Sequence, residues 1–297
     1  MNVYDASVII PTYNRLNELE LTLNSLLAQK CKYKFEVIVA DDGSKENTKS
    51  IVDKYVGQLN IRYCYQEDLG FRAGAARNMG IRLSNGDICI FIDNGIILHS
   101  RALESHIDVH KMKTAPCVVI GYVYAFLVDE ERIAELLEII TNNTPDDAIN
   151  IMHDNGFHDT RETYYQELGY DLSKWPAPFT ICWSCNISVK KEMLIEVGMF
   201  DEFFVGWGHE DQELGISLYR SNVEFILSQE ASSIHFPHEK QDLSINSIKN
   251  YKFHEIQNIL KRGEYIRTKH PIREVEVYVE NWDPFNVNKI LLKERHD

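Results

Sequence analysis

The stretch that decides the fold is Phe35-Glu-Val-Ile-Val-Ala-Asp-Asp-Gly-Ser44. Its first six residues are mostly apolar, as in a strand buried on both faces, and its last four are residues that turns favour. A similar apolar run, Ala6–Pro11, precedes it, and leucines at helical spacing from Leu19 to Leu27 lie between the two runs. The chain therefore begins with a strand–helix–strand unit.

The same alternation continues to about residue 124. The spacing of apolar residues predicts strands at 61–65 and 87–93 and helices at 51–56 and 73–83. Strands that are separated by helices at short intervals form βαβ units. We therefore expect an α/β fold with a mostly parallel sheet flanked by helices.

The alternation stops between residues 125 and 178. A helix is expected near 129–141, followed by polar and aromatic material without clear periodicity. A segment of this length inside a compact fold is usually functional, so we interpret it as a helical insertion that lies over the active face as a lid. The strand and helix pattern returns within 179–200, with short strands expected at 223–227 and 231–236.

The last part of the chain, from residue 241, is expected to be a helix and strand extension. Apolar residues at helical spacing predict a helix over 244–262. Val275, Val277 and Val279 alternate with charged residues, which predicts a half-exposed strand.

Charge and composition limit the classes of function. The net charge of −14 argues against a general nucleic-acid binder, which must neutralise phosphates. The N-terminus lacks a signal-peptide pattern, and no apolar run approaches the roughly 20 residues of a membrane span, so we expect a cytoplasmic protein without a transmembrane segment. Cys182 and Cys185 have redox-like spacing but lie in an apolar run, which predicts reduced core thiols.

Polar loops follow three predicted strands, at the sheet edge where α/β proteins bind ligands. They are Pro11-Thr12-Tyr13-Asn14-Arg15, Asp41-Asp42-Gly43-Ser44 and Asp93-Asn94-Gly95. An aspartate there can accept a hydrogen bond from a nucleotide base, an aromatic ring can stack on the base, and a metal ion can hold the phosphates. Turn chemistry explains each loop when it is taken alone. The three together predict a nucleotide site.

A second candidate site is Gly206-Trp207-Gly208-His209-Glu210-Asp211, just before an amphipathic helical pattern. Glu210 and Asp211 would fall in the first helical turn, where the helix dipole favours negative charge. The pair is therefore either an acidic helix start behind a buried tryptophan or a general base beside an aromatic wall. In the second case Trp207, between Gly206 and Gly208, would form that wall.

Several runs resemble the GT-A glycosyltransferases of family 2, especially their bacterial chondroitin-polymerase-like branch. Val8–Asn14 and Val37–Ser44 are typical of that family, and Gly70-Phe-Arg-Ala-Gly-Ala-Ala-Arg-Asn-Met-Gly80 is strongly specific. Gly206–Asp211 together with Ser233–His238 is similar to the C-terminal half that chondroitin polymerases share with β-1,4-galactosyltransferases. The resemblance implies a GT-A, Rossmann-like fold and transfer of a hexose from a UDP-sugar.

The resemblance covers most of residues 5–124 and 179–240 and implies how the chain is divided. Residues 1–124 would form the nucleotide-sugar-binding half, and residues 179–240 the acceptor-binding and catalytic half. The insertion at 125–178 and the extension at 241–297 lie outside the resemblance.

The resemblance also implies roles for single residues. Asp211 would be the general base of an inverting transfer, with Glu210 beside it binding hydroxyl groups, and Asp42 would contact the base of the uridine nucleotide. Trp207 and Gly208 would bind the acceptor sugar, to which Trp207 would offer a flat apolar face. The residues expected to bind the donor are Pro11, Thr12, Tyr13, Arg15, Asp42, Arg72, Asn78, Asp93 and Asn94.

A divalent cation, Mn²⁺ or Mg²⁺, would be held at the diphosphate by Asp93, His235 and His238. The family usually has Asp-x-Asp where this chain has Asp93-Asn94-Gly95, so one carboxylate ligand is replaced by glycine. Because such cations want several oxygen ligands, the chain either binds metal loosely, does without it, or has lost activity.

Two other functions stay open. A catalytically inactive nucleotide-sugar-binding subunit is the more serious alternative, because Gly95 replaces a ligand. A sugar-phosphate nucleotidyltransferase would need a glycine- and arginine-rich loop after the first strand, where this chain has Pro11–Asn14. The expected partners are a UDP-sugar donor and a glycan, peptide, lipid-linked or small-molecule acceptor. The donor sugar, the acceptor and the oligomeric state, a homo-oligomer included, are left open by the sequence.

Overall fold

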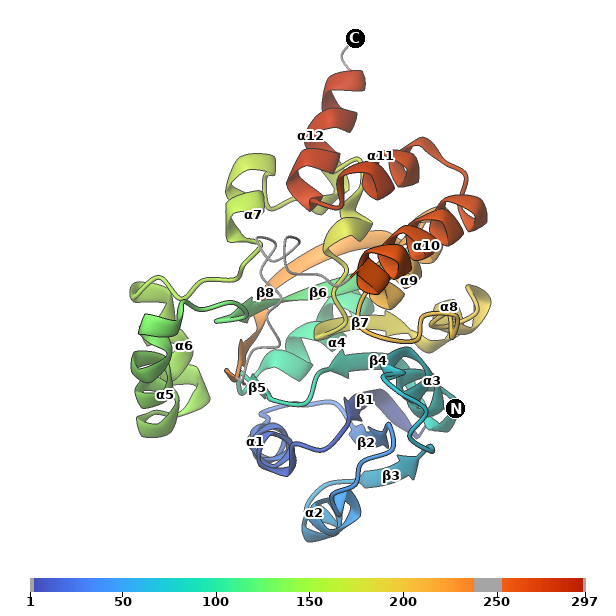
Figure 1. The fold of residues 1–297 in the computed structure, drawn as a ribbon. Coiled ribbons are helices and arrows are strands. Elements are labelled where there is room, and N and C mark those ends of the chain that lie inside the picture. Colours follow the sequence, from blue (N-terminus) through green and yellow to red (C-terminus); the bar gives the residue numbers. More distant parts are fainter. Residues whose placement is uncertain (1–2, 238–252, 296–297) are drawn as a thin grey trace.

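The computed structural model describes residues 3–237 and 253–295, and its centre is one mixed β-sheet (Figure 1). The strands are β1 (Tyr4–Thr12), β2 (Phe35–Asp41), β3 (Ile61–Tyr65), β4 (Gly86–Ile92), β5 (Ile96–Leu98), β6 (Cys117–Tyr124), β7 (Asn186–Lys190) and β8 (Glu224–His235). They lie in the order β3-β2-β1-β4-β7-β6-β8-β5. The first four pair in parallel, and β7 is antiparallel to both of its neighbours. The expected α/β fold with a mostly parallel sheet is confirmed.

Helices cover both faces of this sheet. The first face packs against α1 (Leu16–Leu27), α2 (Thr48–Tyr55) and α4 (Ala102–Met112). The second face packs against α3 (Ala73–Leu83), α8 (Lys191–Glu196) and α9 (Glu210–Arg220). Strand β1 explains the division, because Ala6, Val8 and Ile10 point into the first core and Ile9 points into the second.

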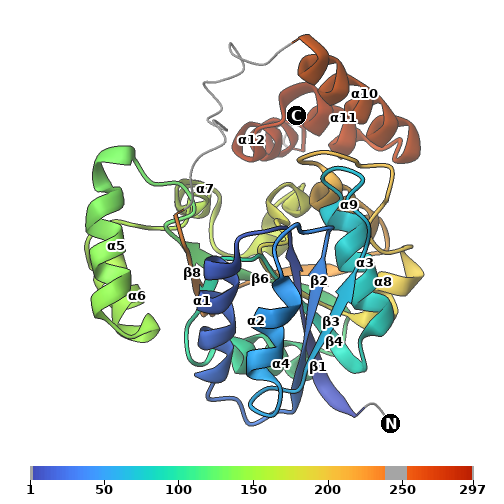
Figure 2. The ribbon, with the colours of Figure 1, turned by 60° about the horizontal axis from the view of Figure 1, so that its bottom comes forward.

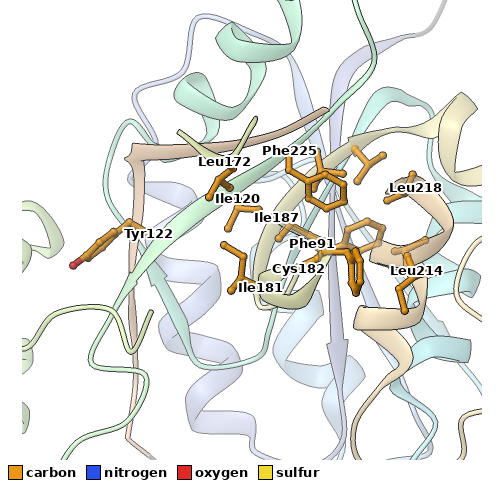
Figure 3. Packing of buried hydrophobic residues seen from close by; sticks show 14 of the residues in the cluster. Phe91, Ile120, Tyr122, Leu172, Ile181, Cys182, Ile187, Leu214, Leu218 and Phe225 are labelled. Carbon is orange, nitrogen blue, oxygen red and sulfur yellow. The ribbon is translucent and has the colours of Figure 1, made fainter. Parts of the chain in front are cut away.

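The second core is the larger, and it joins the two halves of the chain. Figure 3 shows Phe91 of β4 and Ile187 of β7 packed with Leu214 of α9 and Cys182. Phe91 also meets the ring of Phe200 edge-on, with 5.3 Å between ring centroids. Strand β7, from the predicted catalytic half, lies in the sheet between β4 and β6 of the predicted nucleotide-binding half. The two predicted halves therefore share one continuous sheet.

The segment from residue 125 to 178 is helical, as expected. It contains α5 (Ile133–Asn142), α6 (Pro145–Asp154) and α7 (Glu162–Leu168), with single-turn helices at Glu130–Arg132, Leu172–Lys174 and Pro178–Ile181. Both views place α5 and α6 together at one side of the molecule (Figures 1 and 2). Its role as a lid stays a prediction.

A buried ion pair ties this insertion to the sheet. Asp159 accepts hydrogen bonds from Val123 N at 2.8 Å and from the Arg161 guanidinium at 2.6 Å. Arg161, which is fully buried, also donates to the carbonyl oxygens of Gly121 and Ile181. The base of the insertion is therefore part of the core.

The C-terminal extension differs from the prediction. It consists of α10 (Phe253–Lys269), α11 (Arg273–Asn281) and α12 (Pro284–Glu294), so the strand expected at Val275–Val279 is wrong. Glu274 and Glu276 lie in the first turn of α11, where they favour a helix. Helix α10 ends seven residues beyond the predicted Arg262, and residues 244–252 of that prediction lie outside the described residues.

Two smaller predictions can also be compared with the structure. The two short strands expected between 223 and 236 are one strand, β8, with an irregularity opposite Gly121–Val123 of β6. The six cysteines are free thiols, as expected, with Cys182 and Cys185 buried. Within residues 3–237 and 253–295, none of the helices has the length and apolar character that crossing a membrane requires.

Candidate active site

The three polar loops meet at the carboxyl ends of β1, β2 and β4, as the sequence predicts. The Asn94 side chain donates to Thr12 Oγ1 at 2.8 Å and to the Arg15 carbonyl at 3.2 Å. The backbone N–H of Asn14 donates to Ser44 Oγ at 2.7 Å. These hydrogen bonds fix the three loops relative to one another, and the exposed Tyr13 and Arg15 side chains project from them.

Asp42 lies buried at the end of β2 and is held by two donors. Its carboxylate accepts from Gln66 Nε2 and from the backbone N–H of Arg72, each at 2.6 Å. Burial raises the pKa of Asp42, although these hydrogen bonds oppose the shift. Nearby, the Tyr13 hydroxyl donates to Asp68 at 3.1 Å. The structure thus brings Asp42 and Arg72 together, as the predicted donor site requires.

Arg77 connects this edge to the start of α9. Its guanidinium lies 2.8 Å from Asp93 Oδ1 and 3.3 Å from Glu210 Oε1. Arg77 and Glu210 are buried, whereas the Asp93 side chain is 36% exposed and can still meet a ligand. Burial alone would lower the pKa of Arg77, but the carboxylates of Asp93 and Glu210 more than offset it. One buried cation therefore holds the predicted metal ligand beside the predicted catalytic pair.

Glu210 and Asp211 are adjacent, but their surroundings differ. Glu210 is paired with Arg77 through Oε1, and its Oε2 is buried without a hydrogen-bond partner among the described residues. Asp211 accepts hydrogen bonds from the backbone N–H groups of Gln212 at 2.9 Å and of Ser184 at 3.4 Å. Burial raises the pKa of Asp211, and the neighbouring Glu210 carboxylate raises it further. The positive charge of Arg77 opposes this shift without cancelling it. A carboxylate whose pKa is raised suits a proton acceptor.

Asp93 and His235 come from distant parts of the chain to the same edge. Strand β5 starts three residues after Asp93 and pairs with β8, so that Ile96 lies opposite His235. The Phe236 N–H also donates to the Gly95 carbonyl at 3.0 Å. Among residues 3–237 and 253–295, no group of three His, Cys, Asp or Glu side chains could hold a metal ion. Asp93 and His235 therefore do not make a complete cation site by themselves, and His238 lies outside the described residues.

Gly95 is explained by the turn that it occupies. Its φ is +98°, and the Ile96 N–H donates to the Asp93 carbonyl at 3.1 Å, as in a type II turn with glycine at the third position. A Cβ atom here would come no closer than 3.6 Å to the nearest side chain, so the backbone conformation, and not space, favours glycine.

The remaining predicted residues take different positions. Trp207 is 57% exposed, and Gly208 has φ +93°, so this loop presents its indole to solvent. Pro11 is buried near the end of β1. Asn78 is engaged elsewhere, because its amide exchanges hydrogen bonds with the backbone of Phe200 and also donates to Glu202. Its contact with the donor stays a prediction.

Sequence reasoning missed Arg77 and two aromatic residues. Arg77 stands inside the Gly70–Gly80 run, but no local pattern links it to carboxylates 16 and 133 residues away. Phe126 packs between Trp183 and His235, with ring centroids 5.3 and 4.8 Å apart, and so lines the region beside the predicted metal ligand. Trp183 directly precedes Ser184, whose N–H meets Asp211.

Comparison with known proteins identifies the class to which this fold and site belong. Two solved glycosyltransferase structures have the same fold: the mannosyltransferase PcManGT from Pyrobaculum calidifontis, in complex with GDP-Man and Mn²⁺, and TarS 1–349 from S. aureus, in complex with UDP-GlcNAc. The first has a TM-score of 0.61 at 19% identity and covers 98% of this chain and 74% of that one. The second has a TM-score of 0.59 at 20% identity and covers 92% and 66%. The expected GT-A fold is confirmed.

The chain belongs to glycosyl transferase family 2, whose model matches residues 7–197. Residues 167–239 also match the model described as the N-terminal domain of galactosyltransferase. Validoxylamine A glucosyltransferase of Streptomyces hygroscopicus subsp. jinggangensis is 36% identical over 79% of this chain and 56% of its own length. Chondroitin synthase of Escherichia coli is 33% identical over 77% of this chain and 34% of its own length. The chain spans about half the length of the first of these curated relatives.

Proposed function

We propose that the protein transfers a hexose from a UDP-sugar to a hydroxyl group of an acceptor, with inversion at the anomeric carbon. The observation that carries this proposal is the link from Asp93 through Arg77 to Glu210, which joins the loop after β4 to the start of α9, where Asp211 follows Glu210. A donor anchored at Asp42 and Asp93 would then lie next to a proton acceptor. Membership of glycosyl transferase family 2 supports the reaction class, and the UDP-GlcNAc complex of TarS supports the nucleotide.

The proposed reaction is a single displacement. The acceptor oxygen forms a bond to the anomeric carbon, its proton passes to the Asp211 carboxylate, and the bond to the diphosphate breaks with its electron pair leaving on UDP. The Oε2 atom of Glu210, which is buried and has no hydrogen-bond partner among the described residues, would accept a hydrogen bond from a substrate hydroxyl. Trp207 would offer the acceptor sugar an apolar face. A divalent cation held by Asp93 and His235 would supply positive charge for the leaving diphosphate.

UDP release from a panel of donors tests this proposal. We expect release from at least one of UDP-glucose, UDP-GlcNAc, UDP-galactose and UDP-glucuronate, faster with an acceptor than with water alone. The acceptor panel would include validoxylamine A and short chondroitin and hyaluronan oligosaccharides. Binding of UDP without release from any donor would favour an inactive subunit. Formation of pyrophosphate from UTP and a sugar phosphate would favour a nucleotidyltransferase.

Replacing Asp42 by alanine is expected to weaken UDP binding by about tenfold or more, because a hydrogen bond to a charged group contributes roughly 1.5–3 kcal/mol. Isothermal titration calorimetry with UDP measures the change. Asp53→Ala is the matched control, since Asp53 forms an exposed ion pair with Lys49 on the surface of α2. Equal UDP affinity in the Asp42→Ala variant and the control would remove Asp42 from the donor site.

Divalent cation binding is expected to depend on the nucleotide. Asp93 and His235 offer two ligands, few for a cation that prefers about six, so the diphosphate must supply others. The imidazole ligand favours Mn²⁺ over Mg²⁺. Titration of Mn²⁺ followed by electron paramagnetic resonance should therefore show weak binding alone and much tighter binding with UDP. Tight Mn²⁺ binding without UDP, or full transfer activity in excess EDTA, would contradict this expectation.

A further inference from the structure

Arg262 of α10 makes an unusual set of contacts with the loop that precedes the catalytic pair. Its guanidinium donates to the backbone carbonyls of Val205 at 2.6 Å, Trp207 at 2.5 Å and Gly208 at 3.4 Å. A planar fork of donors suits several acceptors at once. A Cβ atom at Gly206 would lie 2.7 Å from Arg262 Nη2, so the guanidinium occupies the space beside this glycine.

The backbone of this loop needs such support. Gly206, Gly208 and His209 all have positive φ, at +94°, +93° and +77°. A residue other than glycine in this region stores about 1–3 kcal/mol of strain and keeps its conformation only where its surroundings fix it. On the opposite side of the loop, the Gly206 N–H donates to the Phe71 carbonyl at 2.8 Å. The loop is therefore held between the segment before α3 and the C-terminal helices.

Helix α10 also holds the segments on both sides of this loop. Before it, Asp201 accepts from Tyr265 and Lys269, each at 2.6 Å. After it, the buried Glu213 of α9 accepts from His270 at 2.7 Å and pairs with Lys269 at 2.8 Å. Figure 2 shows α10 and α11 lying over α9 and the end of α3.

The flanking contacts lie outside the loop, whereas Arg262 donates hydrogen bonds to Trp207 itself and to its neighbours in the loop. All of its hydrogen bonds to described residues end on the loop from Val205 to Gly208. It lies beyond residue 239, where the family matches end. The family resemblance therefore says nothing of this contact, which belongs to the C-terminal extension of this chain.

We propose that Arg262 is a positioning residue, which holds the Val205–Gly208 loop in the conformation that presents the Trp207 ring to the acceptor. The inference rests on the proposed function, since it assigns Trp207 to the acceptor side. The donor is bound by the strand-end loops, with which Arg262 shares no hydrogen bond in the described part of the chain. Its loss should therefore affect use of the acceptor and spare affinity for UDP.

The test compares Arg262→Ala and Arg262→Lys with Arg273→Ala. Arg273 is a matched control, because its ion pairs with described residues are those with Glu276 and Glu294 on the outer helices. Hydrogen–deuterium exchange of residues 203–209 measures the loop directly. Calorimetry with UDP measures donor affinity, and steady-state kinetics uses the donor and acceptor with the highest turnover in the panels above. Added guanidinium chloride at millimolar concentration tests rescue of Arg262→Ala.

We expect faster exchange across 203–209 in Arg262→Ala, a rise in acceptor KM of about tenfold, as a loss of about 1.4 kcal/mol would give, and a UDP affinity within about twofold of the parent. Exchange and acceptor KM of Arg262→Lys should lie between those of the parent and of Arg262→Ala, because an ammonium group cannot reach three carbonyls at once. Added guanidinium should restore part of the loss in Arg262→Ala. Exchange and acceptor KM no different from those of Arg273→Ala would overturn the proposal. A loss of UDP affinity in Arg262→Ala as large as its rise in acceptor KM would also overturn the proposal.

Failure of the proposed function gives a separate result. If the parent protein released no UDP from any donor, the exchange of residues 203–209 would still decide whether Arg262 fixes the loop. Unchanged exchange in Arg262→Ala would then reject the positioning role by itself.

Discussion

Replacement of Asp211 by asparagine is expected to lower kcat for transfer by about 10²–10⁴, the usual contribution of a general base. The two N–H groups donate to different oxygens of Asp211, so asparagine can keep the shorter hydrogen bond, from Gln212, with its amide oxygen and loses only the longer one, from Ser184. The start of α9 should therefore stay intact. Affinity for UDP should change little. Initial rates of UDP release and calorimetry with UDP measure the two quantities on the same preparation.

Glu210→Gln is the informative comparison for this variant. The amide oxygen of glutamine can still accept from Arg77, while the charge beside Asp211 is removed. Because that charge helps to raise the pKa of Asp211, the pKa should fall toward the ordinary range in Glu210→Gln.

The same pair predicts a pH profile. The proton-accepting form of Asp211 is lost as the pH falls through its raised pKa, so kcat/KM of the parent should decline at a higher pH than for an ordinary aspartate. In Glu210→Gln this acidic limb of the pH profile should move to lower pH.

Retention of more than half of the parent activity in Asp211→Asn would remove Asp211 from the mechanism.

Replacing Arg77 by methionine is expected to have the second large effect. The change leaves the buried Glu210 and the partly exposed Asp93 without the cation between them. Breaking a buried ion pair from one side costs about 3–5 kcal/mol. We expect a Tm lower by roughly 10 °C, since 1 kcal/mol corresponds to about 2–4 °C in a chain of this size class, and loss of most transfer activity.

Arg82→Met is the matched control on the same helix. Arg82 is exposed and lies 3.4 Å from Glu202, a surface pair of the kind that contributes about 0–1 kcal/mol. A second variant, Arg77→Met with Glu210→Gln, removes one of the stranded charges and should recover part of the Tm without restoring activity. An Arg77→Met protein with the Tm and activity of the parent would show that the bridge between Asp93 and Glu210 is unimportant.

The part of the site that could be predicted from sequence is the part made by local structure. The strand-end loops follow continuous apolar runs, which predict strands buried on both faces. Asp42, Asp93 and Asn94 could therefore be placed at the same edge of the sheet. Arg77 could not be assigned, because its role depends on α9 lying beside α3, and no pattern within α3 encodes that contact. The sequence shows that Gly95 stands where the family usually has aspartate. It does not show the cause, which is a turn in which Gly95 has a φ of +98°.

The C-terminal extension shows how a local pattern can mislead. Val275, Val277 and Val279 alternate with Glu276 and Tyr278, which is the period of a strand. In the structure α11 packs against both α10 and α12, so apolar residues are buried around much of the helix. Gly263 of α10 allows this close approach, because a Cβ there would lie 2.9 Å from Val279 and 3.0 Å from Trp282. Because α11 is packed on two sides, its sequence lacks the single apolar stripe by which a surface helix is identified.

The position of β8 sets an order in which the site can be assembled during synthesis. This strand is the last of the sheet in the sequence, yet it lies between β6 and β5. A nascent chain that ends before residue 224 has the strand-end loops, Arg77 and both carboxylates of the catalytic pair, but β5 has no strand to pair with. Pairings between residues so far apart in sequence form late, because a long loop must close first. The pairing of β5 with β8 is therefore expected to be one of the final folding steps. A truncated chain would acquire the strand-end loops well before His235 could reach the edge of the sheet where Asp93 lies.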